Sequence, residues 1–283
     1  MPTSADAVRL APTEIARDTF VLHDLRLDLD PTRPHRDEAS PTRLHTNALL
    51  IRGEQPVLVD TGLPGNRERF LEDLFGLVDP VDLRWIVLTH EGIGHHGNVA
   101  AVVEHCPRAT VVTSWPTMVR LEFLLQVPEE RWCWIGEDET LRAGDRHLIA
   151  LRPPIYDAAG TIGIWDPSTR VYWASECFGA PVHLPTAWAE ELDLSTWRAG
   201  FGQLHRWISA WAADVDRDVH LARVERLEAL DPAVIASVLG PAIGSELLPD
   251  AFELLRLVPE LDTDPPPARP GGVRPRHVSG TAR

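Results

Sequence analysis

The chain is poor in cysteine. Its 283 residues include Cys106, Cys133 and Cys177, which are odd in number, far apart and without a CxxC pair. This spacing argues against a disulfide scaffold and against a thiolate zinc site, and it fits a reducing compartment. We therefore expect a cytoplasmic protein.

Positive charge is also scarce. The chain has 27 Lys and Arg against 42 Asp and Glu, which gives a formal net charge of −15. Nucleic acids and anionic membranes are bound through clustered Lys and Arg, so neither partner is expected. No apolar run approaches the roughly 18 residues of a membrane-spanning helix, and the first residues carry no signal-peptide core. There is no P-loop pattern for a nucleotide cofactor.

What the sequence does contain predicts one α/β domain. With 44% hydrophobic residues it can bury a sizeable core. We expect strands at 19–22, 46–51, 56–59, 85–88 and 109–113, and three more between 146 and 173. Helices are expected at 67–77, 98–105, 116–126, 194–211, 219–230 and 249–257. We assign 13–261 to the domain, 1–12 to a flexible N-terminus, 30–42 to a loop and the Pro/Gly/Arg-rich 262–283 to a disordered tail.

The predicted strand 85–88 runs directly into a histidine-rich turn, residues 89–98. Such a turn presents side chains from a fixed strand end and a fixed helix start toward a common point. Imidazoles and carboxylates placed there can bind one or two divalent metals. The candidate ligands of the turn are His90, Glu91, His95 and His96.

The pattern of Thr89-His90, His95 and Gly97-Asn98 resembles the T-H-x-H-x-D-H-x-G-N motif of the metallo-β-lactamase superfamily. Further segments resemble, in the same order, one branch of that family, the oxygen-reducing flavodiiron proteins and their stand-alone diiron domains. These segments are 14–21, 46–51, 57–62, 173–179 (resembling LFSSDAFG) and 235–241 (resembling IAPSHGP). The resemblance implies an α/β fold, the αβ/βα four-layer sandwich of the metallo-β-lactamase type.

Carried over by position, the resemblance implies an incomplete metal site. His90 and His95 match metal-binding histidines, and Glu176 falls at the position of the metal-bridging Asp. The positions that carry residues other than the family's ligands are Gly92, Gly94, Tyr156 and Leu239. An intact dinuclear centre is therefore not expected.

The remaining residues favour at most one Fe or Zn ion, held by His90, His95 and Glu176. Glu91 and His96 are each displaced by one residue from ligand positions, and a shifted turn could bring either of them inward. Tyr156 and Glu176 are the candidate acid/base groups, while Asp157 is a candidate for the pocket rim.

Three functions remain open at this point. The chain is a metal-dependent hydrolase or oxidoreductase acting on a small molecule, a catalytically silent binding or scaffold member, or a metal-independent enzyme that reuses the pocket. The sequence has no room for a flavodoxin-like module, so FMN binding is not expected and redox chemistry would need a separate redox partner. A homo-oligomer is compatible with all three.

Overall fold

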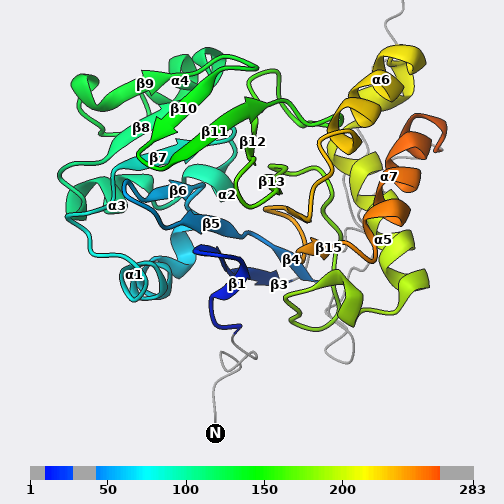
Figure 1. Ribbon diagram of the computed structural model, residues 1–283, viewed down its shortest axis with the longest axis horizontal. Coiled ribbons are helices and arrows are strands. Elements are labelled where there is room, and N and C mark those ends of the chain that lie inside the picture. Colours follow the sequence, from blue (N-terminus) through cyan, green and yellow to red (C-terminus); the bar gives the residue numbers. More distant parts are fainter. Residues whose placement is uncertain (1–9, 28–42, 262–283) are drawn as a thin grey trace, which may run out of the picture.

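The computed structural model describes residues 10–27 and 43–261, which form two β-sheets packed face to face between two sets of helices (Figure 1). The predicted loop 30–42, the predicted tail 262–283 and most of the predicted flexible N-terminus lie outside these residues. The sandwich itself confirms the expected αβ/βα four-layer architecture.

The N-terminal sheet has the strand order β1-β2-β5-β6-β7-β8-β9. Its strands are β1 Thr13–Ala16, β2 Thr19–Leu22, β5 Ala48–Ile51, β6 Val57–Val59, β7 Trp85–Leu88, β8 Thr110–Thr113 and β9 Trp132–Trp134. Pairing is antiparallel from β1 to β6 and parallel from β6 to β9. The strands expected at 46–51 and 56–59 form the antiparallel β5–β6 pair.

The C-terminal sheet has the order β10-β11-β12-β13-β14-β15, antiparallel except for the β13–β14 pair. Its strands are β10 Thr140–Ala143, β11 Arg146–Leu151, β12 Gly163–Asp166, β13 Val171–Trp173, β14 Val234–Ala236 and β15 Ile243–Gly244. A small separate hairpin joins β3 Leu25–Leu27 to β4 Arg43–His45. The three strands predicted between 146 and 173 are confirmed.

Side chains that alternate in direction along the strands fill three apolar layers: one between the two sheets and one between each sheet and its outer helices. On β6, Val57 and Val59 face the core between the sheets, whereas Leu58 faces the helices outside the N-terminal sheet. On β13, Trp173 faces inward and Tyr172 faces the helices outside the C-terminal sheet. Because side chains point alternately to the two faces of a strand, strands buried on both faces are continuous apolar runs.

Helices cover the outer face of each sheet (Figure 1). They are α1 Arg67–Phe75, α2 Ile93–His96, α3 Val99–His105, α4 Trp115–Leu121, α5 Leu194–Ile208, α6 Arg217–Glu228 and α7 Leu248–Leu257, with 3₁₀ turns at Pro64–Asn66, Glu129–Arg131, Ala189–Glu191, Ala210–Asp214 and Val258–Glu260. The α4 helix ends at Leu121, earlier than the predicted 126. Phe123 and Leu124, which extended the apolar pattern, are 86% and 71% exposed and so mark no buried helix face.

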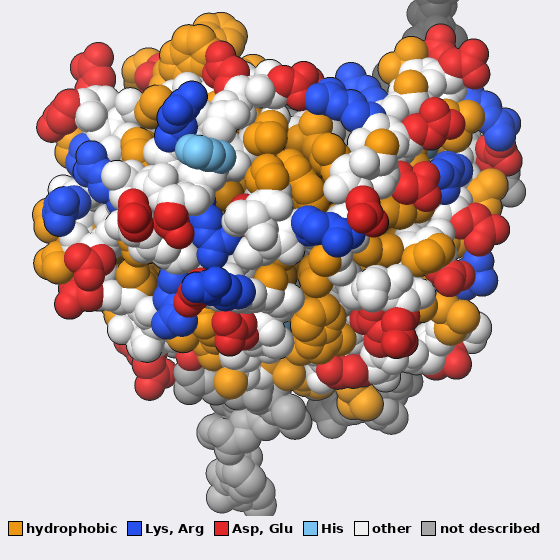
Figure 2. All heavy atoms as spheres, viewed as in Figure 1, with side chains coloured by type: hydrophobic (Ala, Val, Ile, Leu, Met, Phe, Trp, Pro, Cys, Tyr) orange, Lys and Arg blue, Asp and Glu red, His pale blue; other side chains and the backbone are white. Residues whose placement is uncertain are grey.

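Acidic and basic side chains are interspersed over the face of the molecule shown in Figure 2, with apolar patches between them. This face offers no continuous basic surface for a nucleic acid. Among the described residues, every helix is too short or too polar to cross a lipid bilayer.

The packing between the sheets predicts a large difference between two leucines. Leu49 is 1% exposed in the central core, whereas Leu184 is 72% exposed. Leu49→Ala should lower the free energy of unfolding by about 2–5 kcal/mol, because it removes buried apolar surface and leaves a cavity. Leu184→Ala should change it by less than about 0.5 kcal/mol. Denaturant unfolding measures both, and equal losses would contradict the packing described.

Candidate metal centre

The candidate site lies where strands of both sheets end. Asp60 follows β6 and His90 closely follows β7, and because these two strands are parallel their ends meet at one edge of the N-terminal sheet. Glu176 comes three residues after β13 of the C-terminal sheet. The short helix α2 turns the chain back, and the backbone bond from Thr61 N to His95 O (2.7 Å) fixes His95 beside the strand ends.

The structure brings together His90, His95 and Glu176, whose potential ligand atoms all lie within 4.8 Å of one another. His90 Nε2 is 3.4 Å from Glu176 Oε2, and His95 Nε2 is 3.5 Å from Glu176 Oε1. The two imidazoles stack, with ring centroids 4.5 Å apart and an interplanar angle of 13°. All three residues are buried. The carboxylate therefore faces one nitrogen of each ring.

The stacked rings depend on the missing side chain of Gly92. A Cβ at this position would lie 2.7 Å from His90 Cε1, which would have to move, and 3.2 Å from His95 Cδ2, which would have to give by a few tenths of an ångström. Gly94 is different, because the nearest atom to a Cβ there would be Thr46 Cγ2 at 3.6 Å. Of the two turn glycines at expected ligand positions, Gly92 is thus the one that this ring arrangement requires.

A buried aspartate orients His95. Asp60 accepts hydrogen bonds from Thr89 N (2.9 Å), Thr89 Oγ1 (2.7 Å) and Trp173 Nε1 (2.9 Å), and its Oδ2 is 3.2 Å from His95 Nδ1. Thr89 Oγ1 also lies 2.9 Å from Ser175 Oγ. A carboxylate behind one imidazole nitrogen fixes the ring orientation and leaves the other nitrogen for a ligand. In this arrangement, His95 Nε2 is the nitrogen that faces Glu176.

Asp157, which the sequence offers as a candidate for the pocket rim, lies beside His90. Its Oδ2 lies 3.2 Å from His90 Nε2, and its side chain is 48% exposed at the solvent side of the cluster. The Gly92 amide donates to His90 Nδ1 at 2.5 Å, so the neutral ring carries its proton on Nε2, between Asp157 and Glu176. The neighbouring Tyr156 was the sequence candidate, and a shift of one residue would have found Asp157.

The cluster shifts the pKa of each of its members. Burial opposes charge on His95, but Asp60 and Glu176 outweigh it and raise the pKa to about 10. Burial likewise opposes charge on His90, while Asp157 and Glu176 raise its pKa to about 9 against the charge of His95. Burial alone would raise the pKa of Glu176, but the two histidines lower it to about 2. Proximity of opposite charges thus outweighs desolvation at all three positions.

The other predicted ligands of the turn point elsewhere. Glu91 accepts a hydrogen bond from Thr117 Oγ1 (3.2 Å) and pairs with Arg120 (3.1 Å), so it ties the turn to α4. His96 follows His95 in α2 and is half-buried outside the three-residue group. Consecutive residues of a helix do not share a face. The structure therefore does not bring Glu91 or His96 into the cluster.

Tyr156, the predicted acid/base group, packs away from the cluster. Its ring lies 4.6 Å from that of Trp211, and the guanidinium of Arg152 lies 5.0 Å from its centroid. Leu239 is buried in the core between the sheets, where its Cβ approaches Gly179. Of the predicted site residues, the structure thus assembles only His90, His95 and Glu176.

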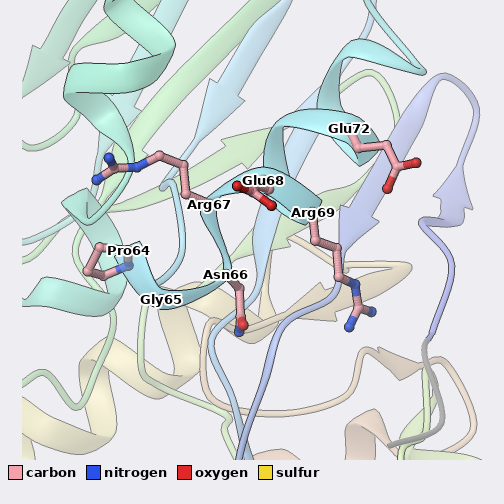
Figure 3. A pocket seen from close by; sticks show the side chains of 7 residues that line it. All are labelled: Pro64, Gly65, Asn66, Arg67, Glu68, Arg69 and Glu72. Carbon is pink, nitrogen blue, oxygen red and sulfur yellow. The ribbon is translucent and has the colours of Figure 1, made fainter. Parts of the chain in front are cut away.

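A separate pocket lies at the start of α1 (Figure 3). It is lined by Pro64, Gly65, Asn66, Arg67, Glu68, Arg69 and Glu72. Its charged side chains are of both signs and point in different directions, with Arg67 directed away from Arg69 (Figure 3). None of these residues belongs to the cluster of His90, His95 and Glu176.

Sequence comparison places part of the chain in a known family. The profile of the metallo-beta-lactamase superfamily matches residues 41–124. Diflavin flavoprotein A 1 of Synechocystis sp. (strain ATCC 27184 / PCC 6803 / Kazusa) is 28% identical over 134 residues, which are 47% of this chain and 23% of that protein. A Nostoc sp. (strain PCC 7120 / SAG 25.82 / UTEX 2576) relative, also named as a diflavin flavoprotein, is 34% identical with the same coverage. The chain thus spans about a quarter of the length of these relatives.

Solved structures agree with the fold. Rubredoxin oxygen:oxidoreductase from Desulfovibrio gigas superposes with a TM-score of 0.75 at 17% identity, over 88% of this chain and 61% of that one. The flavodiiron protein from Giardia intestinalis gives 0.71 at 16% identity, over 89% and 60%. At these identities the likeness speaks for the fold alone. Residues 41–124 thus match the metallo-beta-lactamase superfamily, and the solved structures with a similar fold include a flavodiiron protein.

Proposed function

We propose that this protein is a metal-dependent enzyme with a reduced site, in which His90, His95 and Glu176 hold one divalent transition-metal ion, Fe or Zn. The observation that carries this proposal is the convergence of three buried ligand atoms within 4.8 Å. Two histidines and one carboxylate form a ligand set that suits either ion. The proposal replaces the dinuclear centre of the family with a mononuclear one.

The residues fit such an ion. Among the described residues, Glu176 Oε2 is a buried oxygen without a hydrogen-bond partner, which is the state of a ligand atom that awaits a cation. Asp60 supports His95 from behind, as outer carboxylates do for metal-binding histidines. Asp157, on the solvent side of His90, could add a further carboxylate.

When bound, the ion would supply Lewis acidity, or redox chemistry if it is iron. The chain's own part is to orient His95 through Asp60 and to place the carboxylate of Asp157 beside His90 Nε2. The half-exposed Asp157 is then the group that exchanges protons with a small-molecule substrate or with water. An oxidoreductase would also need a redox partner that supplies electrons.

A metal-free function has one specific observation in its favour. The Gly92 amide donates to His90 Nδ1, whereas ligation through Nε2 needs a proton on Nδ1, so this amide would have to turn away. A silent binding member of the fold, or an enzyme using these groups as acid and base, is therefore the second candidate.

Metal content separates the two candidates. Protein purified without a histidine tag and titrated with Zn²⁺, Fe²⁺ or Mn²⁺ should bind about one equivalent of metal per chain. His95→Ala and Glu176→Ala should each weaken binding by at least about 10-fold, because three ligands are near the minimum for a catalytic site. His96→Ala, which removes the neighbouring histidine, should bind metal as the unmodified protein does.

Two results would count against the metal proposal. One is far less than one equivalent of metal under all these conditions. The other is equal metal affinity in His95→Ala and His96→Ala. Either would favour the metal-free candidate.

The raised pKa values of the histidines predict that metal binding depends on pH. His95, with its pKa at about 10, is protonated at pH 7, and His90, at about 9, adds up to one more proton. An ion must displace these protons, so affinity should rise by about 10- to 100-fold per pH unit between pH 6 and 8. The rise should level off above pH 10, where both groups are already deprotonated. Competition with a chelator of known pH dependence measures the metal affinity at each pH. An affinity that does not change with pH would contradict the raised pKa values of the two histidines.

The two turn glycines provide a matched pair of substitutions. Gly92→Ala should lower the free energy of unfolding by about 1–3 kcal/mol and weaken metal binding, because its Cβ displaces the stacked rings. Gly94→Ala has space and lies in α2, so it should be neutral or stabilising by up to about 1 kcal/mol. Denaturant unfolding and metal titration test both. Equal behaviour of the two variants would show that the ring stack does not depend on Gly92.

A further inference from the structure

The turn that carries Glu176 has a strained backbone. Ser175 and Phe178, on either side of Glu176, have φ angles of +54° and +63°, the left-handed region that non-glycine residues rarely adopt. Such conformations persist only where surrounding contacts enforce them. The turn from Ser175 to Phe178 must therefore be held by contacts with its surroundings.

The side chain of Glu176 does not fix the turn. Among the described residues its Oε2 has no hydrogen-bond partner, and its carboxylate contacts the two histidines at 3.4 and 3.5 Å. Those contacts are themselves the candidate metal site. The position of the carboxylate thus depends on the backbone of the turn.

Contacts from two distant segments hold that backbone. On one side, Ser175 O accepts hydrogen bonds from Ser237 Oγ (2.9 Å) and Val238 N (2.8 Å) after β14. On the other side, the Phe178 amide donates to His205 Nε2 at 3.1 Å. The second contact comes from α5, which otherwise takes no part in the site.

His205 is set up to accept this bond. Its Nδ1 donates to Phe201 O (2.8 Å), so the lone pair of the neutral ring lies on Nε2 and faces the Phe178 amide. The ring is fully buried and stacks on Phe201 at 4.2 Å. Burial also lowers its pKa to about 4, which keeps the acceptor free near neutral pH.

We propose that His205 is a positioning residue for the metal centre. By accepting the Phe178 amide, it holds the strained turn in the conformation that presents Glu176 to His90 and His95. The proposal rests on the proposed metal function, and it adds α5 as a support of the ligand geometry.

The test uses three variants of the full chain. His205→Leu removes the acceptor, and His205→Gln restores an acceptor at a similar distance from the backbone. His220→Leu is the matched control, because His220 is also a buried histidine on a helix of the same layer, bonded to the Leu255 carbonyl at 2.8 Å. Thermal unfolding of each variant records the general loss of stability.

Two measurements report on the turn. The first, on metal-free protein, follows the imidazole ¹⁵N signals of His90 and His95 and the hydrogen exchange of the Phe178 amide. The second is the Co²⁺ affinity together with the Co²⁺ absorption spectrum. In His205→Leu we expect shifted imidazole signals, faster exchange of the amide, a changed Co²⁺ spectrum and an affinity at least about 10-fold weaker. His205→Gln should recover most of these properties, and His220→Leu should retain them.

Unchanged imidazole signals in His205→Leu would overturn the proposal, as would equal effects of His205→Leu and His220→Leu at similar stability. If His205→Leu unfolds, His205→Gln alone tests the proposal. Slow hydrogen exchange of the Phe178 amide in His205→Gln would support it, and fast exchange would contradict it. If the unmodified protein binds no Co²⁺, the proposed metal function fails, while the metal-free measurements still decide the role of His205.

Discussion

The carboxylate of Asp60 is the contact on which the site and the packing of the two sheets both depend. It is fully buried, and a buried charge is tolerated only when it is well paired. Its partners are Thr89 from the end of β7 and Trp173 from β13 in the opposite sheet, with His95 beside them. One aspartate therefore joins the two sheets and sets the orientation of a ligand. Its φ of +60° shows that the local backbone is strained to place it there.

The fold could be predicted because its signals are local and repeated. Strands such as β6 and β7 are short apolar runs, and α5 buries residues at helical spacing, among them Trp197 and Phe201. The secondary-structure predictions fail where the apolar pattern of the sequence does not match the residues that the fold buries. The apolar pattern of α4 continued into the exposed Phe123 and Leu124, and the short strand β10, in which Leu141 and Ala143 are buried, was not among the expected strands. Periodicity identifies a buried face only where tertiary packing covers it.

The site was harder to predict, since it depends on the direction of side chains within one turn. His90 and His95 were found because they match histidines of the family's motif, and Glu176 because its segment, 173–179, resembles the one that carries the metal-bridging Asp. Glu91 has the right chemistry but reaches α4 instead of the cluster. Asp157 lies on a loop held by nonlocal contacts such as Ser114 Oγ to Gly160 O at 2.5 Å. No sequence spacing encodes such a contact.

The residues that depart from the family pattern act together in our proposal. Gly92 removes one ligand and at the same time gives the rings of His90 and His95 space to stack. Stacked rings turn both Nε2 atoms toward Glu176, which concentrates the remaining ligands at a single point. Restoring a side chain at position 92 would therefore separate these rings before it could add a ligand. Under the proposed single-metal site, Gly92 accounts both for the missing second metal position and for the geometry of the first.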